Sequence, residues 1–224
     1  RLLRAPALPA DAEEVLLTGD DKVDFLSVFK VLTKELVCHM SPYSFPPRAA
    51  QYLQEMMDYN VPHGKLTRGL TVIHTLRSLR GGTLTSTEFR RAAVLGWCVE
   101  WLQAMFLVMD DIMDGSLTRR GQDCWYLKDD VKMNAINDAL ILETQVYVLL
   151  KRYFCEDVEY VQLLEMMHEV THLTALGQFL DLTTADPHEV DFSLFSIDVH
   201  SKIIIYKTAF YSFYLPVACG MILG

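Results

Sequence analysis

Three aspartates at the end of an apolar run are the residues best suited to chemistry. Asp110, Asp111 and Asp114 directly follow the apolar run 104–109. On a helix, Asp114 shares a face with both of the others, because it lies four residues after Asp110 and three after Asp111. Their carboxylates repel one another and oppose the negative end of the helix dipole. A divalent cation would relieve that repulsion, and oxygen ligands favour Mg²⁺ or Mn²⁺ over zinc. The alternative is a solvated, acidic helix end.

Basic residues suggest what such a cation would hold. Arg119 and Arg120 follow the aspartates within one short loop. Carboxylates for a metal with guanidinium groups beside them are typical of a metal-bridged phosphate or diphosphate. Lys65 and Arg68 form a second cationic pair at a predicted helix start, where the helix dipole also favours an anion. An exposed basic face is the alternative for this second pair.

Two further polar pairs interrupt apolar helical stretches. Gln178 and Asp181 lie three residues apart, and Lys207 is followed by Thr208 in the most apolar stretch of the chain. A buried lysine needs a partner or a function. Each pair is therefore a candidate for a functional site, with a structural polar contact as the alternative.

The elements that must position these residues are predicted to be helices. Apolar residues recur at three- and four-residue steps nearly throughout, without alternating strand patterns. A capping box at Thr85 and Glu88 opens the helix that leads to the aspartates. A polar loop is expected over 115–132, a break at Asp186-Pro187, and a kink at Pro216. The expected helices cover about 22–40, 46–60, 65–79, 85–109, 134–154, 158–182 and 191 or 193 onward. The sequence thus predicts a large all-α bundle with buried central helices.

Composition narrows the class of protein. Hydrophobic residues make up 51% of the 224 residues, which argues against a disordered chain. The formal net charge of −9 argues against non-specific nucleic-acid binding. The 5 cysteines are scattered without a CxxC pair, so we expect reduced thiols rather than a disulfide framework or a zinc ribbon.

The two ends of the chain raise the questions of targeting and of a membrane. The stretch 203–224 is the nearest to a membrane span, but it contains Lys207, Ser212 and Pro216, so we expect a buried core helix and no span. The first ten residues carry arginine and no acid. We therefore divide the chain into an N-terminal segment, 1–20, as a remnant of a targeting region or a ragged terminus, and one helical domain, 21–224.

Four segments of the chain carry a family resemblance. They are QAMFLVMDDIMDGSLTRRGQDCWY from Gln103, GKLTRGLTVI from Gly64, GQFLDL from Gly177 and YKTAFYSFYLP from Tyr206. These segments resemble farnesyl diphosphate synthases of the eukaryotic type, which are short-chain trans-isoprenyl diphosphate synthases. Their order and spacing agree with that family, and the similarity extends from about Asp24 onward.

The resemblance implies an isoprenoid-synthase-type bundle around a deep central cavity, assembled as a homodimer. The implied reaction is the 1′–4 condensation of isopentenyl diphosphate with dimethylallyl or geranyl diphosphate to give farnesyl diphosphate. It implies three Mg²⁺ ions bound with the substrate, with Mn²⁺ as the alternative. We expect the cytoplasm as the location, with the mitochondrion as the alternative.

The resemblance also implies residue roles in binding the two diphosphates. Asp110 and Asp114 would bind the Mg²⁺ ions that hold the allylic diphosphate. Asp111 would support that cluster and the nearby arginine, and Arg119 would contact the allylic diphosphate. The residues implied for isopentenyl diphosphate are Lys65, Arg68 and Arg120, with Gln103 near that site.

Further implied roles concern the allylic cation and the product. Lys207 would touch the allylic diphosphate, and the path of the cation would be lined by Lys207, Thr208, Gln178 and Asp181. Residues four and five before the first aspartate, Phe106 and Met105, would close the floor of the pocket. One aromatic and one flexible side chain there predict a short product, C15 or C10.

Departures from the family pattern leave rival readings open. The family's second aspartate-rich motif does not appear by Gly224, so we expect an N-terminal portion of a longer protein, with a naturally shortened relative as the alternative. His63 and Phe179 differ from the usual pattern and indicate an altered substrate range. The rival functions are a geranyl diphosphate synthase, an altered-substrate homologue and a non-catalytic prenyl-diphosphate-binding subunit of a dimer. A terpene cyclase would not need the cations at Lys65, Arg68 and Arg120.

Overall fold

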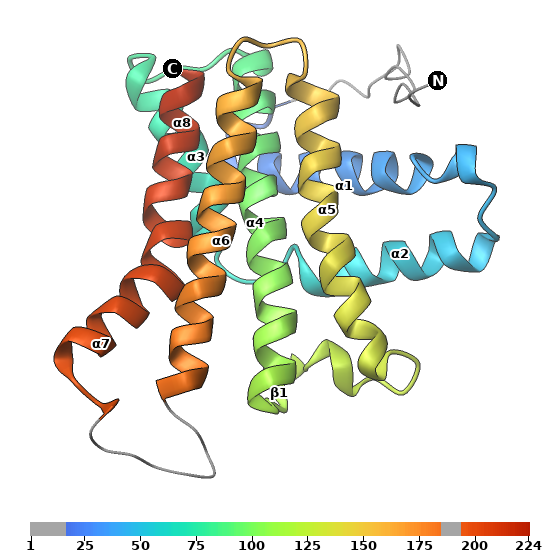
Figure 1. Cartoon of the computed structure of the whole chain (residues 1–224). Coiled ribbons are helices and arrows are strands. Elements are labelled where there is room, and N and C mark those ends of the chain that lie inside the picture. Colours follow the sequence, from blue (N-terminus) through green and yellow to red (C-terminus); the bar gives the residue numbers. More distant parts are fainter. Residues whose placement is uncertain (1–16, 185–193) are drawn as a thin grey trace.

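The structure, a computed structural model, describes residues 17–184 and 194–224, which are helical over most of their length (Figure 1). The all-α prediction is confirmed. The helices before the gap are α1 (Asp21–Cys38), α2 (Pro47–Asn60), α3 (Thr67–Leu79), α4 (Ser86–Asp114), α5 (Ala135–Phe154) and α6 (Tyr160–Thr184). Short 3-10 turns lie at Ser41–Tyr43, Trp125–Leu127 and Lys132–Asn134. The Asp186-Pro187 break and the starts predicted at Asp191 or Ser193 lie outside the described residues.

Helix α4 runs through the middle of the bundle, with α3, α5 and α8 packed around it (Figure 1). Thr85 and Glu88 form the predicted capping box at its start. Most of its middle residues are apolar and buried, and Trp97 and Trp101 are fully buried. The helix ends where Gly115 takes the left-handed conformation, with φ of 61°. The aspartates therefore stand at the end of the most buried helix of the fold.

The loop after α4 contains a short hairpin that the sequence did not predict. Strand β1 (Thr118–Arg119) pairs antiparallel with β2 (Gln122–Asp123). Between them Arg120 and Gly121 have φ of 54° and 83°, which is the pattern of a type I′ turn. Strands of two residues are too short to show an alternating pattern. The expectation of a plain polar loop over 115–132 was wrong in this respect.

The C-terminal segment departs from a simple kinked helix. It consists of α7 (Ile197–Ile203), capped by Ser196, then the π-helical run η5 (Ile204–Tyr214) and α8 (Leu215–Leu223). Proline lacks an N–H, and its ring collides with the carbonyl four residues earlier in an α-helix. We attribute the π-helical run to Pro216, which lies just beyond it, because the wider helix moves that carbonyl away.

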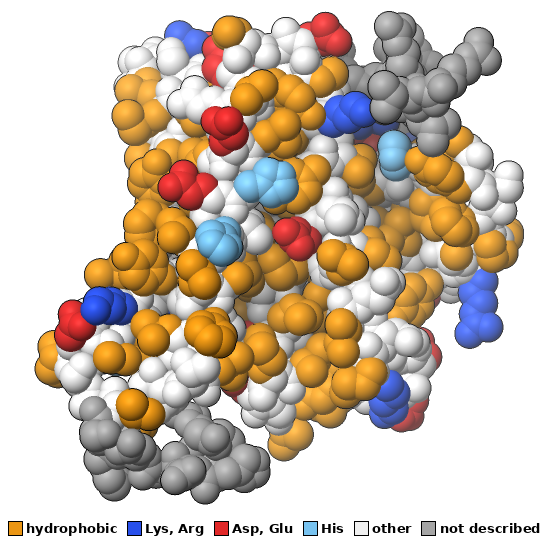
Figure 2. All heavy atoms as spheres, in the orientation of Figure 1, with side chains coloured by type: hydrophobic (Ala, Val, Ile, Leu, Met, Phe, Trp, Pro, Cys, Tyr) orange, Lys and Arg blue, Asp and Glu red, His pale blue; other side chains and the backbone are white. Residues whose placement is uncertain are grey.

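Two helical stretches are long and apolar enough to cross a membrane by length and composition alone. In Ser86–Asp114 the apolar window is 83% buried within the protein, which marks it as a core helix. In Ile197–Leu223 the corresponding value is 33%, so the prediction of a buried core helix was wrong for most of this stretch. It lies at the edge of the bundle beside α3 and α6 (Figure 1), and apolar side chains gather on its face in Figure 2. The absence of a membrane span stays a prediction.

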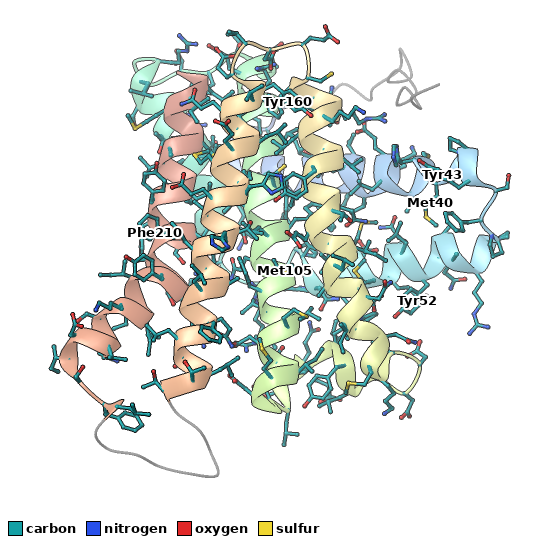
Figure 3. All side chains as sticks on the ribbon, in the orientation of Figure 1. Met40, Tyr43, Tyr52, Met105, Tyr160 and Phe210 are labelled. Carbon is teal, nitrogen blue, oxygen red and sulfur yellow. The ribbon has the colours of Figure 1, made fainter. Side chains whose placement is uncertain are left out.

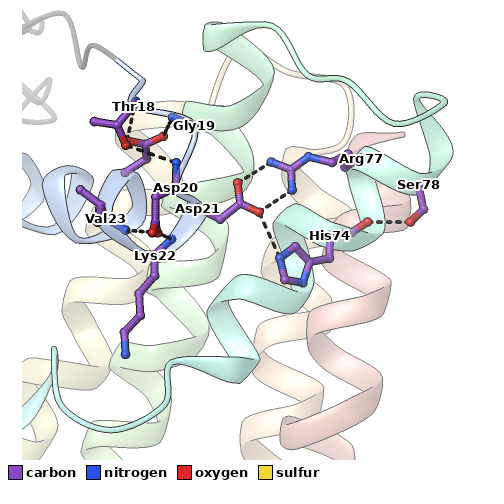
Figure 4. A network of polar contacts seen from close by, with 10 residues as sticks. Thr18, Gly19, Asp20, Asp21, Lys22, Val23, His74, Arg77 and Ser78 are labelled. Atoms are coloured by element: carbon purple, nitrogen blue, oxygen red, sulfur yellow. Dashed lines mark hydrogen bonds and ion pairs between the residues drawn. The ribbon is translucent and has the colours of Figure 1, made fainter.

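A polar network ties the start of α1 to α3 (Figure 4). Asp20 caps α1, because its carboxylate accepts the backbone N–H groups of Lys22 and Val23. Asp21 instead reaches α3, where its carboxylate is bound by both terminal nitrogens of Arg77 and lies 3.1 Å from His74 Nε2. The hydrogen bond from Arg77 lowers the pKa of Asp21. Its stabilising effect is therefore present above the ordinary pKa of about 4 and is lost as the pH falls through the lowered value.

Asp21→Asn is expected to lower the free energy of unfolding by about 1 kcal/mol at pH 7, because it removes a charge-assisted pair that is partly exposed. The difference from the wild type should shrink below about pH 4, where the carboxylate protonates. Urea titrations at several pH values measure this. Asp20→Asn is the matched control, since asparagine caps helices as well as aspartate does. An equal loss in both variants, or a loss independent of pH, would contradict the assignment.

Candidate active site

A pocket of about 190 Å³ lies where α4, α6 and η5 meet. It is lined by Phe106, Leu107, Met109, Asp110, Met113, Thr174, Gln178, Lys207, Thr208 and Tyr211. Five residues singled out from the sequence thus converge on one space, although they come from distant parts of the chain. They are Phe106, Asp110, Gln178, Lys207 and Thr208.

Gly177 allows this convergence. A Cβ built on Gly177 would lie 2.1 Å from the backbone nitrogen of Lys207 and 2.5 Å from the carbonyl carbon of Tyr206. Helix α6 and the π-helical run η5 therefore touch backbone to backbone at this point. This contact sets the position from which the Lys207 side chain enters the site.

Lys207 bridges two carboxylates from different helices. Its Nζ donates to Asp181 Oδ2 at 2.5 Å and lies 3.3 Å from Asp110 Oδ1. Burial acts to lower the pKa of Lys207, but the hydrogen bond to Asp181 and the charge of Asp110 outweigh it, so the pKa is raised. The ammonium is therefore charged at neutral pH. It joins the aspartate-rich end of α4 to the last turn of α6.

The three aspartates of α4 face different partners. Asp110 Oδ2 accepts from Arg119 Nη2 at 3.2 Å, while its buried Oδ1 accepts no hydrogen bond. Asp111 is turned toward the hairpin, where Arg119 donates to it from Nε at 2.9 Å and from Nη2 at 2.5 Å. Burial, together with the Asp110 carboxylate, raises the pKa of Asp114. Asp110 and Asp114 thus leave carboxylate oxygens on one face, and Asp111 orients Arg119.

This arrangement fits a hard cation that is held partly by a substrate. Two buried oxygen atoms of the lining residues accept no hydrogen bond: Asp110 Oδ1, which pairs with the Lys207 ammonium at 3.3 Å, and Thr174 Oγ1. Within 17–184 and 194–224, no group of three or more His, Cys, Asp or Glu side chains assembles into a closed metal cage. Mg²⁺ commonly uses only one or two carboxylates and takes its remaining ligands from water and phosphate oxygens. Asp110 and Asp114 would supply the carboxylate ligands of such a site, and a bound diphosphate and water would supply the others.

A second cationic cluster lies on the other side of Tyr211. Arg68 donates to Ser212 Oγ at 2.7 Å and to the Tyr211 hydroxyl at 3.3 Å, and its guanidinium lies 4.8 Å from the centre of the Tyr211 ring. Burial lowers the pKa of Arg120, and Arg68 is one of the charges that act on it. The Arg120 side chain packs over Gly64, where a Cβ would come within 3.2 Å of Nε. The Tyr211 ring also packs against Phe106, with 5.7 Å between the centroids, so it touches both the pocket and this cluster.

Other residues singled out from the sequence do not line this pocket. Lys65 is exposed just before α3, and Gln103 is buried in α4. Met105 is buried in the core (Figure 3) and is not among the residues that line the pocket. Neighbouring helix positions point about 100° apart, and in this helix Phe106 is turned toward the pocket while Met105 packs into the core. Phe179, one of the two departures from the family pattern, is 63% exposed and also lies outside the lining.

Sequence reasoning missed several polar residues of the site. Glu100 is 3% exposed within α4, close to Arg68 and Arg120. An acid inside an apolar helix was the signal that could have revealed it. Tyr211, Ser212 and Thr174 carried no such signal, because hydroxyl side chains are common on packed helices.

Comparison with known proteins agrees with this geometry. The family model described as polyprenyl synthetase matches residues 50–224. The chain belongs to the polyprenyl synthetase family. The resemblance to farnesyl diphosphate synthases is confirmed.

Individual relatives show how far the similarity extends. The chain is 49% identical to the farnesyl pyrophosphate synthase of Ganoderma lucidum over 197 residues, which cover 88% of this chain and 55% of that protein. It is 51% identical to the Candida albicans farnesyl pyrophosphate synthase over 200 residues, or 88% and 57% of the two chains. The crystal structure of Trypanosoma brucei farnesyl diphosphate synthase superposes with a TM-score of 0.85 at 35% identity, covering 89% of this chain and 61% of that one. The chain thus spans between about half and three fifths of the length of these relatives.

Proposed function

We propose that the protein to which this chain belongs condenses isopentenyl diphosphate with dimethylallyl or geranyl diphosphate and forms farnesyl diphosphate. The observation that carries the proposal is the pair of cationic sites on either side of Tyr211 and Phe106. One contains Lys207 and the aspartates, and the other contains Arg68 and Arg120. Two diphosphates need two such sites, with the reacting carbons between them. The farnesyl diphosphate synthases among the relatives support the same reaction.

The chain's own residues have separate roles in this reaction. Asp110 and Asp114 would hold Mg²⁺, whose charge would stabilise the diphosphate that departs. Lys207 supplies a fixed positive charge at the same place, and Arg119, oriented by Asp111, supplies a second. The half-buried lining side chains Phe106 and Met109 would keep water from the reacting carbons.

The proposed condensation breaks one C–O bond, forms one C–C bond and releases one proton. The allylic C1–O bond breaks, and its electron pair leaves with the diphosphate. C1 of the allylic unit then bonds to C4 of isopentenyl diphosphate, and a proton lost from C2 leaves with the released diphosphate. Gln178 and Thr208 line the pocket with polar groups that stabilise the cation without forming a bond to it. The products are a chain longer by five carbons and one inorganic diphosphate.

We also propose the homodimer that the family resemblance implies, and a cytoplasmic location. Apolar side chains cover much of the face shown in Figure 2. Among the large apolar side chains that remain exposed are Phe213, which is 72% exposed, and Met221, which is 60% exposed. An exposed apolar surface of this kind is typical of an interface. Light scattering of the full-length gene product tests the dimer, and localisation of a tagged protein tests the compartment, with the mitochondrion as the alternative.

The reaction is tested by mass spectrometry of products made by the full-length gene product. It is supplied with isopentenyl diphosphate and either geranyl or dimethylallyl diphosphate, with Mg²⁺, with Mn²⁺ or with EDTA. We expect a C15 diphosphate that forms only when a divalent cation is present. A C10 end product would favour a geranyl diphosphate synthase. Binding of both diphosphates without any product would overturn the proposal in favour of a non-catalytic subunit.

Phe106→Ala is expected to lengthen the product beyond that of the wild type, because it removes an aromatic ring from the pocket lining. Product length is read by chromatography of the dephosphorylated alcohols. Met105→Ala is the contrasting variant. Since Met105 is buried in the core, the variant should lose about 2–5 kcal/mol of stability and keep the product length. A longer product from Met105→Ala alone would contradict the placement of these two side chains.

A further inference from the structure

Glu100 is a buried acid that caps a neighbouring helix. It lies in α4 and is 3% exposed, and its Oε1 accepts the backbone N–H of Gly69 at 2.8 Å. Gly69 is the third residue of α3, and the residue before that helix, Leu66, provides no side-chain cap. The first N–H groups of a helix need acceptors, and a carboxylate there also interacts well with the helix dipole. Glu100 thus supplies from α4 the cap that α3 lacks in its own sequence.

Backbone contact between the two helices makes this cap reachable. A Cβ built on Gly96 would lie 2.5 Å from the carbonyl oxygen of Gly69. A Cβ built on Gly69 would lie 3.0 Å from the carbonyl oxygen of Gly96. The two glycines therefore bring α3 and α4 together one turn before Glu100. The first turn of α3, which carries Arg68, is fixed by this contact and by the cap.

Glu100 also provides the negative charge beside the second cationic cluster. Burial raises the pKa of Glu100 and outweighs the Gly69 N–H and the charges of Arg68 and Arg120, which act to lower it. The positive charges of Arg68 and Arg119 repel the Arg120 guanidinium, and the carboxylate of Glu100 attracts it. The carboxylate therefore offsets the mutual repulsion of the guanidinium groups.

The hydrogen bonds of Arg68 leave it available to a ligand. Its guanidinium is held by the neutral hydroxyls of Tyr211 and Ser212, and among the described residues it forms no ion pair with Glu100. Neutral hydroxyls compete poorly with a diphosphate for a guanidinium, because charge-assisted hydrogen bonds are about twice as strong. Glu100 acts on Arg68 through its charge and through the helix, without occupying the donors.

We propose that Glu100 is a positioning residue for the isopentenyl diphosphate site. It holds the first turn of α3 against α4 and offsets the repulsion between Arg68 and Arg120. Both guanidinium groups are thereby positioned to bind one diphosphate. This inference rests on the proposed function for the assignment of that diphosphate. It adds a residue that touches neither substrate.

The test is Glu100→Gln in the full-length gene product, with isopentenyl and geranyl diphosphate varied separately. The amide oxygen of glutamine can still accept the Gly69 N–H, so the change removes mainly the charge. We expect KM for isopentenyl diphosphate to rise about tenfold, which corresponds to about 1.4 kcal/mol. We expect KM for geranyl diphosphate to stay within about twofold and Tm to change little. Glu100→Ala should add a fall in Tm to a larger rise in KM.

Glu35→Gln is the matched control. Glu35 joins α1 to α5 by accepting from the Tyr153 hydroxyl at 2.8 Å and lying 2.9 Å from Arg152 Nε. The same chemical change there should lower Tm and leave both KM values unchanged. If the wild type turns over and Glu100→Gln has unchanged KM values, or equal changes in both, the positioning role is wrong. If the wild type does not turn over, the proposed function fails. In that case the affinity for isopentenyl diphosphate is measured by calorimetry for the wild type and for Glu100→Gln. Equal affinities of these two proteins would overturn the inference.

Discussion

Asp110→Asn is expected to reduce turnover at saturating substrate about a thousandfold. Asp110 is the carboxylate with one buried oxygen that accepts no hydrogen bond, and it lies between Lys207 and Arg119. The variant loses the negative charge that a divalent cation requires, and its amide nitrogen would face an ammonium or a guanidinium. Removal of one preorganised charge at a reacting phosphate commonly costs a factor of 10² to 10³, and loss of a metal ligand adds to this.

Steady-state kinetics at several Mg²⁺ concentrations measure the effect. High Mg²⁺ should restore only part of the rate, because the ligand charge is lost rather than the ion. Asp129→Asn is the matched control, since Asp129 is exposed and pairs only with Lys132 among the described residues. It should retain the wild-type rate. A rate above about a tenth of the wild type in Asp110→Asn would show that Asp110 is no metal ligand.

Gly177→Ala is expected to cost about 3 kcal/mol of stability and most of the activity. The added Cβ would lie 2.1 Å from the backbone nitrogen of Lys207, and backbone atoms cannot rotate away as a side chain can. Overpacking in cores typically costs 1–3 kcal/mol, so a contact with fixed backbone falls at the upper end. The separation of α6 from η5 would also carry Lys207 away from Asp110 and Asp181.

Thermal unfolding and kinetics of the same preparation test this effect. Leu176→Ala is a suitable control, because Leu176 neighbours Gly177 in α6 but is 47% exposed and outside the pocket lining. Its Tm and rate should stay close to the wild type. An equal Tm for Gly177→Ala and the wild type would contradict the close approach of the two segments.

Local signals in the sequence predicted much of this fold. The capping box at Thr85 and Glu88 sets a helix start that the structure confirms. Such signals act within a few residues, so they are visible without tertiary contacts. The spacing of the aspartates likewise placed Asp110 and Asp114 on one face of α4. Their convergence with Lys207 depends on Gly177, whose close contact lies about thirty residues away along the chain.

Features that depend on tertiary packing were not predictable in the same way. The π-helical run before Pro216 and the two-residue strands leave no periodic pattern. The sequence suggested both Met105 and Phe106 as pocket floor, but the packing around α4 leaves only Phe106 in the lining and buries Met105 in the core. The high hydropathy of the C-terminal stretch suggested burial, whereas its place at the edge of the bundle leaves much of it exposed.

The most direct test of the central claim is the ratio of inorganic diphosphate released to isopentenyl diphosphate consumed by the full-length gene product. The two cationic sites predict one diphosphate released for each isopentenyl unit joined, only when both substrates and Mg²⁺ are present. Release of diphosphate from geranyl diphosphate alone, at the same rate with and without isopentenyl diphosphate, would contradict the account. It would show that the cluster around Arg68 and Arg120 is no site for the second substrate.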